Sequence, residues 1–444
     1  MGIVLLLSYI IVSFLLIFII RKNGISSSEY FVSGRNASYK TVGFSIITSC
    51  IGASATIGMI GLAFSVGTPA FWWLGSGAVG LLILTLFVAK KVRRTEKFTM
   101  SETVDTFLSS SCKPIVSIII VVAWTAILAA QLTAMTKVVA SLTLLSHITV
   151  LLISTAIIVL HTFLGGQLTV MKFDRIQVLI IFTGLLSVLT WLFLNNDFPT
   201  EVKLEIYNDK FPLSKMLYYL LIVGGSYIVC PMLFGRILSA KSETEAKKGA
   251  MLAVGGLLVG AIIIVMIGLY AKGIIPDTTN PDNVLNTLFD LVLPKWLFYM
   301  VSITLISAIV SSADSCLITA ATVMSNDILG KKDKNTCRIC VLILGLGAMF
   351  LTFMDRSIIG FLLMANDVYV CGVVIPVFIG IILHGKFKIR KQAALVAIIV
   401  GSLLGMLSAI TQINTYAYIA LLASFLITVL GAKKLSQEQL KFLP

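Results

Sequence analysis

The segment Thr48-Ser-Cys-Ile-Gly-Ala-Ser-Ala-Thr-Ile-Gly58 interrupts a long apolar run with small and hydroxyl-bearing residues. A second apolar run, further along the chain, contains Gly224-Gly-Ser226 and then Pro231, which has no backbone N–H to donate. Interrupted apolar helices at corresponding positions of two chain halves indicate a binding site near the middle of a membrane. The alternative is ordinary packing of small residues between membrane helices.

The composition excludes a water-soluble protein. The chain has 444 residues, of which 58% are hydrophobic and only 12% are charged, whereas a soluble domain has about a quarter charged residues. The net charge of +14 comes mostly from short basic clusters between apolar runs. This pattern is typical of cytoplasmic loops and predicts no nucleic-acid partner. The motifs H-E-x-x-H and G-x-S-x-G and the Walker loop are absent, so we do not expect an enzyme.

Thirteen apolar runs approach the length of about 20 residues that a spanning helix needs. The predicted fold class is therefore an all-α polytopic membrane protein with about 13 transmembrane helices. The two interrupted runs are each the first helix of a predicted five-helix half. The thirteen runs cover residues 3–20, 41–66, 70–92, 115–143, 147–164, 168–194, 212–235, 247–271, 296–326, 337–354, 357–383, 392–411 and 415–431.

The distribution of charge predicts the orientation of the chain. With the N-terminus outside, most Lys and Arg residues fall in cytoplasmic loops, and the acidic stretch 195–209 falls outside. We therefore expect a multi-pass protein of the plasma (inner) membrane with a cytoplasmic C-terminus. The predicted parts are a first helix with its inside loop (1–40), a ten-helix transport core (41–383, with halves 41–194 and 212–383), and two C-terminal helices with a short tail (384–444).

Three acidic residues fall within or at the ends of apolar runs, where a charged group is costly and usually faces a partner or a cavity. They are Asp174, Asp314 and Asp367. Next to Asp314, four residues recur at helical spacing and share one helix face, namely Ala308, Ser311, Ser312 and Ser315. Hard cations prefer oxygen ligands, so this face predicts an ion site. The alternative is that the serines only hold membrane helices together.

Four motifs occur in a fixed order along the chain. They are Glu29-Tyr-Phe-Val-Ser-Gly-Arg35, Thr162-Phe-Leu-Gly-Gly166 followed by Asp174-Arg-Ile-Gln177, the segment from Pro231 to Arg236 followed by Ala240-Lys241, and Ala308-x-x-Ser311-Ser312. In this order they resemble the sodium:solute symporter family, whose members carry proline, pantothenate, sialic acid or glucose. The resemblance runs from about residue 29 to about residue 385. It implies a leucine-transporter-like fold, in which two inverted five-helix repeats work by alternating access.

The resemblance also implies a sodium ion bound where the first interrupted helix unwinds against the serine-bearing helix. The implied ligands are the backbone carbonyls of Thr48, Ile51 and Ala308 and the hydroxyls of Ser311 and Ser312. Some family members bind a second cation, and the matching positions here are Asp174, Ser311, Asp314 and Ser315. Sodium is the only cofactor expected.

The chain departs from the family pattern near the implied site. His161 stands where many members have Tyr, and Cys50 stands where Asp or Asn is common. The positions that would face a sugar are Ala55, Leu74 and Gly77, which disfavours a sugar substrate. We therefore predict sodium-coupled symport of a small polar organic solute, with an amino acid or carboxylate favoured over a sugar.

The candidates to line the solute cavity are Ser54, Gln131, Tyr227, Asn366 and Asp367. The carboxylate of Asp367 predicts a substrate that carries an amine; the alternative is that Asp367 faces a neighbouring helix. The expected partners are a small-molecule solute and the lipid bilayer, with no obligatory protein partner.

Two other functions remain open on the sequence. A proton-coupled carrier of the same fold would use Asp314 as its titrating group. A membrane sensor built on this fold would normally carry a cytoplasmic signalling domain, and the 13 residues after Gly431 are too few for one.

Overall fold

The computed structural model describes residues 2–20, 26–143, 145–199, 202–276, 279–354 and 357–435, so most of the predicted C-terminal tail lies outside the described residues. The described chain is almost entirely helical, which confirms the predicted all-α class. One short antiparallel pair, β1 (Phe387–Ile389) with β2 (Ala432–Lys434), is the exception. The helices are α1 (Gly2–Ile20), α2 (Ser27–Val32), α3 (Tyr39–Cys50), α4 (Met59–Val66), α5 (Trp72–Ile83), α6 (Ala89–Arg94), α7 (Met100–Phe107), α8 (Lys113–Leu142), α9 (His147–Asn195), α10 (Leu213–Tyr218), α11 (Gly224–Ile228), α12 (Pro231–Ser239), α13 (Glu243–Ile274), α14 (Val284–Leu291), α15 (Lys295–Val323), α16 (Lys334–Leu351), α17 (Ile358–Tyr369), α18 (Ile375–Leu383), α19 (Lys391–Thr411) and α20 (Asn414–Leu430).

Ten helical segments of the described chain are long and apolar enough to cross a membrane, and the bent pair formed by α3 and α4 raises this number to 11. With 17 residues, α20 is shorter than these segments. The predicted count of thirteen requires that α20 cross the membrane and that α9 form two spans. It stays a prediction, as does the division into 1–40, 41–383 and 384–444.

The long helix α9 is broken at Gly166. Its 49 residues would extend about 74 Å as one straight helix, more than twice the roughly 30 Å hydrocarbon core of a bilayer. Gly166 has φ +65° and ψ −178°, a backbone conformation essentially restricted to glycine. A Cβ at this position would lie 2.5 Å from the ring of Tyr30. The predicted runs 147–164 and 168–194 are therefore two helices joined by this glycine.

Gly166→Ala is expected to destabilise the protein. The backbone conformation alone disfavours alanine by about 1–3 kcal/mol, and the added Cβ would collide with Tyr30. The measurement is the midpoint of thermal unfolding of the detergent-purified chain. The matched control is Gly165→Ala, because Gly165 has helical torsion angles and its Cβ would meet only the Thr169 side chain at 3.3 Å. Equal midpoints for the two variants would contradict the role assigned to Gly166.

Both predicted helix interruptions are present. The first apolar run bends by 60° between Cys50, where α3 ends, and Ser54. The second interruption separates α11 from α12, because Val229 and Cys230 have non-helical backbone before Pro231. Proline suits the first helical position, since the N–H that it lacks would have no partner there. Helix α12 accordingly begins at Pro231.

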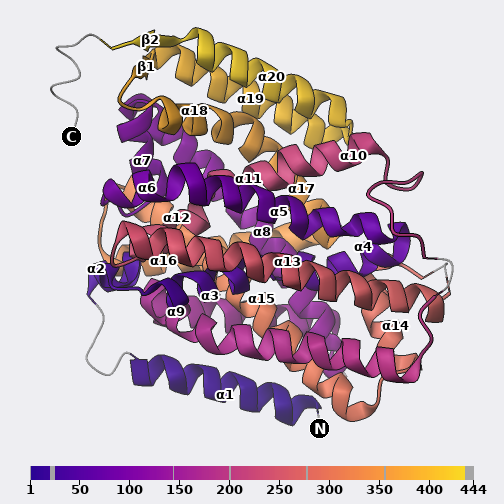
Figure 1. Cartoon of the computed structure of the whole chain (residues 1–444). Coiled ribbons are helices and arrows are strands. Elements are labelled where there is room, and N and C mark those ends of the chain that lie inside the picture. The colour runs from indigo at the N-terminus through magenta and orange to yellow at the C-terminus, as the bar shows by residue number, and fades with distance from the viewer. Residues whose placement is uncertain are drawn as a thin grey trace.

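Helix α15 is central in the bundle. In the most apolar 18-residue stretch of the span that contains it, 94% of the residues are buried, and α15 packs against α9, α8 and α3. In contrast, α1 and the hairpin of α19 and α20 lie at opposite edges of the bundle (Figure 1). The predicted serine face on α15 is therefore enclosed by protein on all sides.

Candidate functional site

The interruption after α3 brings backbone carbonyls against α15. Ile51, which follows the last residue of α3, has non-helical torsion angles (φ −93°, ψ 65°), so the last carbonyls of α3 lose their helical partners. Gly52 permits a close approach, because a Cβ there would lie 2.3 Å from Oγ of Ser312. Residues 54–58 then form a π-helical turn before α4, a feature that is frequent at functional sites.

Ser312 lies directly at this interruption. Its hydroxyl donates to the backbone carbonyls of Thr48 (3.2 Å) and Ser49 (3.0 Å). Ile51 and Ala308, two further implied sodium ligands, are fully buried, and Ala308 lies one helical turn before Ser312 on α15. The structure therefore places Ser312 with Thr48, among oxygen atoms of the kind that hard cations prefer.

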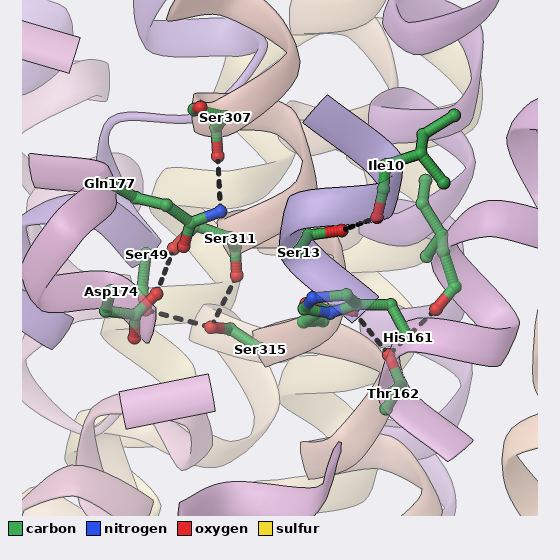
Figure 2. Close-up of polar contacts among 12 residues, drawn as sticks. Ile10, Ser13, Ser49, His161, Thr162, Asp174, Gln177, Ser307, Ser311 and Ser315 are labelled. Atoms are coloured by element: carbon green, nitrogen blue, oxygen red, sulfur yellow. Dashed lines mark hydrogen bonds and ion pairs between the residues drawn. The ribbon is translucent and has the colours of Figure 1, made fainter. Parts of the chain in front are cut away.

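The hydroxyl of Ser311 is directed to Asp174 on α9. It donates to Oδ1 of Asp174 (2.5 Å), and Ser45 on α3 donates to Oδ2 (2.5 Å). All three side chains are buried. Figure 2 shows Asp174, Ser311 and Ser315 grouped together where α9 meets α15. The structure thus unites three of the four residues implied for a second cation site.

A buried arginine that the sequence reasoning did not place in the site completes this group. Arg236 on α12 is 0% exposed. Its guanidinium donates to the hydroxyls of Ser45 (3.2 Å), Ser49 (2.9 Å) and Ser315 and to the backbone carbonyl of Met232 (3.0 Å). The available signal was a charged residue within an apolar segment, which usually has a specific partner. The sequence analysis ended the apolar run at residue 235, so it placed Arg236 in a cytoplasmic loop.

Asp314, the fourth residue implied for the second cation site, belongs to a different cluster. Its carboxylate contacts Nδ1 of His161 and accepts a hydrogen bond from Thr162 (2.7 Å). Figure 2 shows His161 and Thr162 well apart from Asp174 and Ser311. The predicted set Asp174, Asp314 and Ser315 is therefore divided between two clusters, because neighbouring residues of α15 face different helices.

Four of the five predicted solute residues meet in one central cavity of about 70 Å³. Gln131 also supports the interrupted helix, because its side-chain oxygen accepts the N–H of Ala53 (3.0 Å). The sequence analysis missed two aromatic residues of the wall, Trp73 and Trp124, for which the apolar runs gave no distinguishing signal. The polar and aromatic lining includes Ser49, Ser54, Trp73, Trp124, Gln131, Ser226, Tyr227, Ser312 and Asn366.

Asp367, the fifth predicted solute residue, lies elsewhere. It lines a cavity of about 940 Å³ together with Lys137 and Lys215. Its carboxylate accepts hydrogen bonds from Tyr218 (2.6 Å) and Ser408 (3.1 Å). Successive residues of a helix point about 100° apart, so Asn366 and Asp367 face different cavities. Asp367 thus contacts neighbouring helices, which was the alternative interpretation.

The end of the bundle opposite this large cavity is closed by charged pairs. Lys332 pairs with Glu102 (2.6 Å) and Lys113 pairs with Asp327 (3.1 Å). The cavity at this end measures only about 20 Å³. Burial opposes ionisation of Glu102, but hydrogen bonds from Lys332 and from the N–H of Phe98 outweigh it and lower the pKa below the usual 4.5. The lowered pKa means that ionised Glu102 stabilises the folded chain.

This ion pair predicts a loss of stability in acid. We expect Glu102→Gln to lower the free energy of unfolding by about 1.5 kcal/mol at about pH 7, the lower end of the range for hydrogen bonds to charged groups. The pKa of Glu102 is lowered in the folded chain, so the ion pair stabilises the fold above that pKa and is lost as the pH falls through it; the difference from wild type should therefore be smaller in acid below pH 4.5 than at about pH 7. Thermal unfolding at both pH values measures this. Glu243→Gln should have a smaller effect, since its partner Arg94 is 69% exposed. A difference that persists in acid would contradict the assignment.

Comparison with known proteins gives both the fold and the family. The chain is 24% identical over 382 residues to the high affinity choline transporter 1 of Homo sapiens, covering 77% of this chain and 64% of that protein. It is 22% identical to the high-affinity proline transporter PutP of Bacillus subtilis, covering 68% of each. The chain spans less than two thirds of the length of the choline transporters that it matches.

Solved structures share the architecture. A Na⁺-coupled sialic acid symporter in a substrate-bound outward-open state superposes with a TM-score of 0.81 at 15% identity, covering 98% of this chain and 99% of that one. MhsT in complex with L-phenylalanine gives a TM-score of 0.61 at 14% identity, covering 89% and 98%. These likenesses show the leucine-transporter-like fold. The model of the sodium:solute symporter family matches residues 30–401, so the chain belongs to this family.

Proposed function

We propose that the chain couples the inward flow of sodium to the uptake of a small polar organic solute by alternating access. The observation that carries this proposal is the position of Ser312. Its hydroxyl contacts the carbonyls at the α3 interruption, and the same residue lines the central cavity. A sodium ion bound at Ser312 would therefore be adjacent to the solute, so that each would affect the binding of the other.

We further propose that the solute is a small compound with an ammonium group, such as an amino acid. The faces of Trp73, Trp124 and Tyr227 attract cations, while the amides of Gln131 and Asn366 suit a carboxylate or hydroxyl. The cavity of about 70 Å³ is about half the volume of an engineered cavity that holds benzene. The cavity must widen to admit any of these solutes, and it must widen less for a compact solute than for a hexose. The choline and proline transporters among the relatives carry solutes of this class.

The arrangement of cavities supports an outward-facing state. The large cavity is lined by Pro281 and Asn414 from loops predicted to lie outside, and by His147 and Ser357 at the predicted outer ends of two helices. The charged pairs close the end that carries the predicted cytoplasmic loops. We therefore propose a plasma-membrane protein with its N-terminus outside and its C-terminus in the cytoplasm.

Thermal unfolding tests the proposed coupling. The detergent-purified chain is heated in sodium or in potassium at equal ionic strength, with choline, proline, other amino acids, a dicarboxylate or glucose. A ligand that binds the folded state raises the midpoint. We expect sodium to stabilise the protein and one ammonium-bearing solute to stabilise it further only in sodium. Stabilisation by a solute that is independent of sodium would contradict the coupling, and uptake driven by a pH gradient without sodium would favour the proton-coupled alternative.

Substitutions of the neighbouring residues Asn366 and Asp367 test which of the two cavities binds the solute. Asn366→Ala is expected to weaken solute binding about tenfold or more, which corresponds to about 1.4 kcal/mol, because Asn366 lines the central cavity. Asp367→Asn should change it far less, since Asp367 lines the other cavity. The measurement is the solute concentration that gives half-maximal stabilisation in sodium. A larger loss of solute binding in Asp367→Asn than in Asn366→Ala would instead identify Asp367 as the partner of the substrate amine.

A further inference from the structure

The large cavity has room for a solute, and it adjoins the central cavity along α17. Its volume of about 940 Å³ lies within the range of about 300–1,000 Å³ that is typical of small-molecule sites. The central cavity of about 70 Å³ must widen before it admits the proposed solutes. Neighbouring residues of α17 face the two spaces, with Leu362 and Asn366 on the central cavity and Leu363 and Asp367 on the large one. A solute in the large cavity therefore meets its walls before the central cavity opens.

The two cavities differ in charge. None of the described residues that line the central cavity carries a formal charge. The large cavity is lined by Lys137, Lys215 and Asp367, so its walls carry one more positive than negative charge when histidine is counted as neutral. A cavity with an excess of positive charge attracts an anionic group and repels a solute that is only cationic. Any selection of the solute by fixed lining charges therefore takes place in the large cavity.

Lys215 supplies a positive charge without a carboxylate partner. Its side chain is half-buried, and it forms no ion pair with the described part of the chain. Its ammonium group lies 5.5 Å from the ring centre of Phe211. Phe211 is 0% exposed and packs edge-to-face against Tyr219 at 5.1 Å, so this ring is fixed in place. The ring attracts the positive charge but offers no oxygen acceptor, so the N–H groups remain available to an anion.

The negative charge of the large cavity does not neutralise Lys215. The carboxylate of Asp367 accepts hydrogen bonds from the hydroxyls of Tyr218 (2.6 Å) and Ser408 (3.1 Å), and it forms no ion pair with the described lysines. A carboxylate held by two hydroxyl donors is stabilised where it is. The ammonium group of Lys215 is therefore left for a ligand that brings its own carboxylate.

We propose that Lys215 forms an entry subsite in the large cavity, where its ammonium group binds the carboxylate of the solute before the solute reaches the central cavity. The inference rests on the proposed function and narrows its solute class. A compound with both an ammonium group and a carboxylate, such as an amino acid or a betaine, fits this subsite, whereas choline, which has a hydroxyl instead, does not. An entry subsite must release its ligand inward, so it binds the solute more weakly than the central cavity does in sodium.

Reductive methylation of lysine side chains in the detergent-purified full chain, followed by mass spectrometry, tests this proposal. The probes are glycine betaine and choline, which differ in a carboxylate against a hydroxymethyl group and have no reactive N–H. At equal ionic strength in sodium, a saturating concentration of glycine betaine should slow the methylation of Lys215 by about threefold or more. The exposed Lys210 should be unaffected, and choline should protect neither lysine. Equal rates at Lys215 with the two probes, or equal slowing at both lysines, would overturn the proposal.

Asn366→Ala distinguishes direct contact at Lys215 from a shape change. Asn366 lines the central cavity and is not among the residues that line the large one, so glycine betaine should still protect Lys215 in this variant. Loss of protection would show that Lys215 is shielded only after the solute enters the central cavity, and it would overturn the proposal.

The sodium response of the wild type separates this inference from the proposed function. If glycine betaine fails to protect Lys215 while sodium still raises the thermal midpoint through Ser312, the entry subsite is wrong and the coupling stands. If Lys215 is protected in a chain that sodium does not stabilise, the subsite stands and the sodium coupling is wrong.

Discussion

Ser312→Ala is expected to abolish the stabilisation of the protein by sodium. The hydroxyl of Ser312 donates to the carbonyls of Thr48 and Ser49, which have lost their helical backbone partners at the interruption. Removing it deletes one oxygen ligand and leaves the implied site incomplete. At a sodium concentration of about 100 times the dissociation constant, the loss corresponds to about 2.7 kcal/mol of unfolding free energy. The measurement is the shift of the thermal midpoint between sodium and potassium.

Ser302→Ala provides the matched control for this prediction. Ser302 is buried on the same helix, and its hydroxyl donates only to the carbonyl of Phe298 in the preceding turn (2.8 Å). This variant should keep the full sodium shift even if its absolute midpoint falls. A sodium shift that survives in Ser312→Ala, or that disappears equally in both variants, would rule out Ser312 as the ligand.

Arg236→Met is expected to be the most destabilising single substitution in the cluster. It removes the positive charge beside Asp174 and leaves that carboxylate buried without its compensating partner. Breaking a buried charge pair from one side costs about 3–5 kcal/mol. Denaturation of the purified chain in potassium measures the loss, so that sodium cannot substitute for the missing charge.

The double variant tests the cause of this loss. Asp174→Asn combined with Arg236→Met removes both charges, and it should be more stable than Arg236→Met alone because no uncompensated charge remains. Arg94→Met is the control, since Arg94 is 69% exposed in its pair with Glu243 and such a pair contributes about 0–1 kcal/mol. Additive effects of the two buried substitutions would show that the charges do not interact.

The sequence was sufficient to predict the membrane class and the two interruptions. Hydrophobicity and chain length determine which segments span a bilayer, and glycine and proline restrict where a helix can continue. The segments around Gly52 and Pro231 are therefore interrupted as predicted. Helical spacing placed Ser312 on one face with Ser311 and Ser315, and the family resemblance implied that this helix meets the interrupted one, where Ser312 contacts α3.

Only the tertiary structure decided which buried polar groups are partners. The family resemblance assigned Asp174 and Asp314 to one second cation site, yet Asp174 contacts the serines near Arg236 and Asp314 contacts His161. Asn366 and Asp367 are adjacent, yet they line different cavities. Helical periodicity gives the direction of a side chain relative to its own axis. The partner it meets depends on how the helices pack against each other, and no single segment of the sequence contains that information.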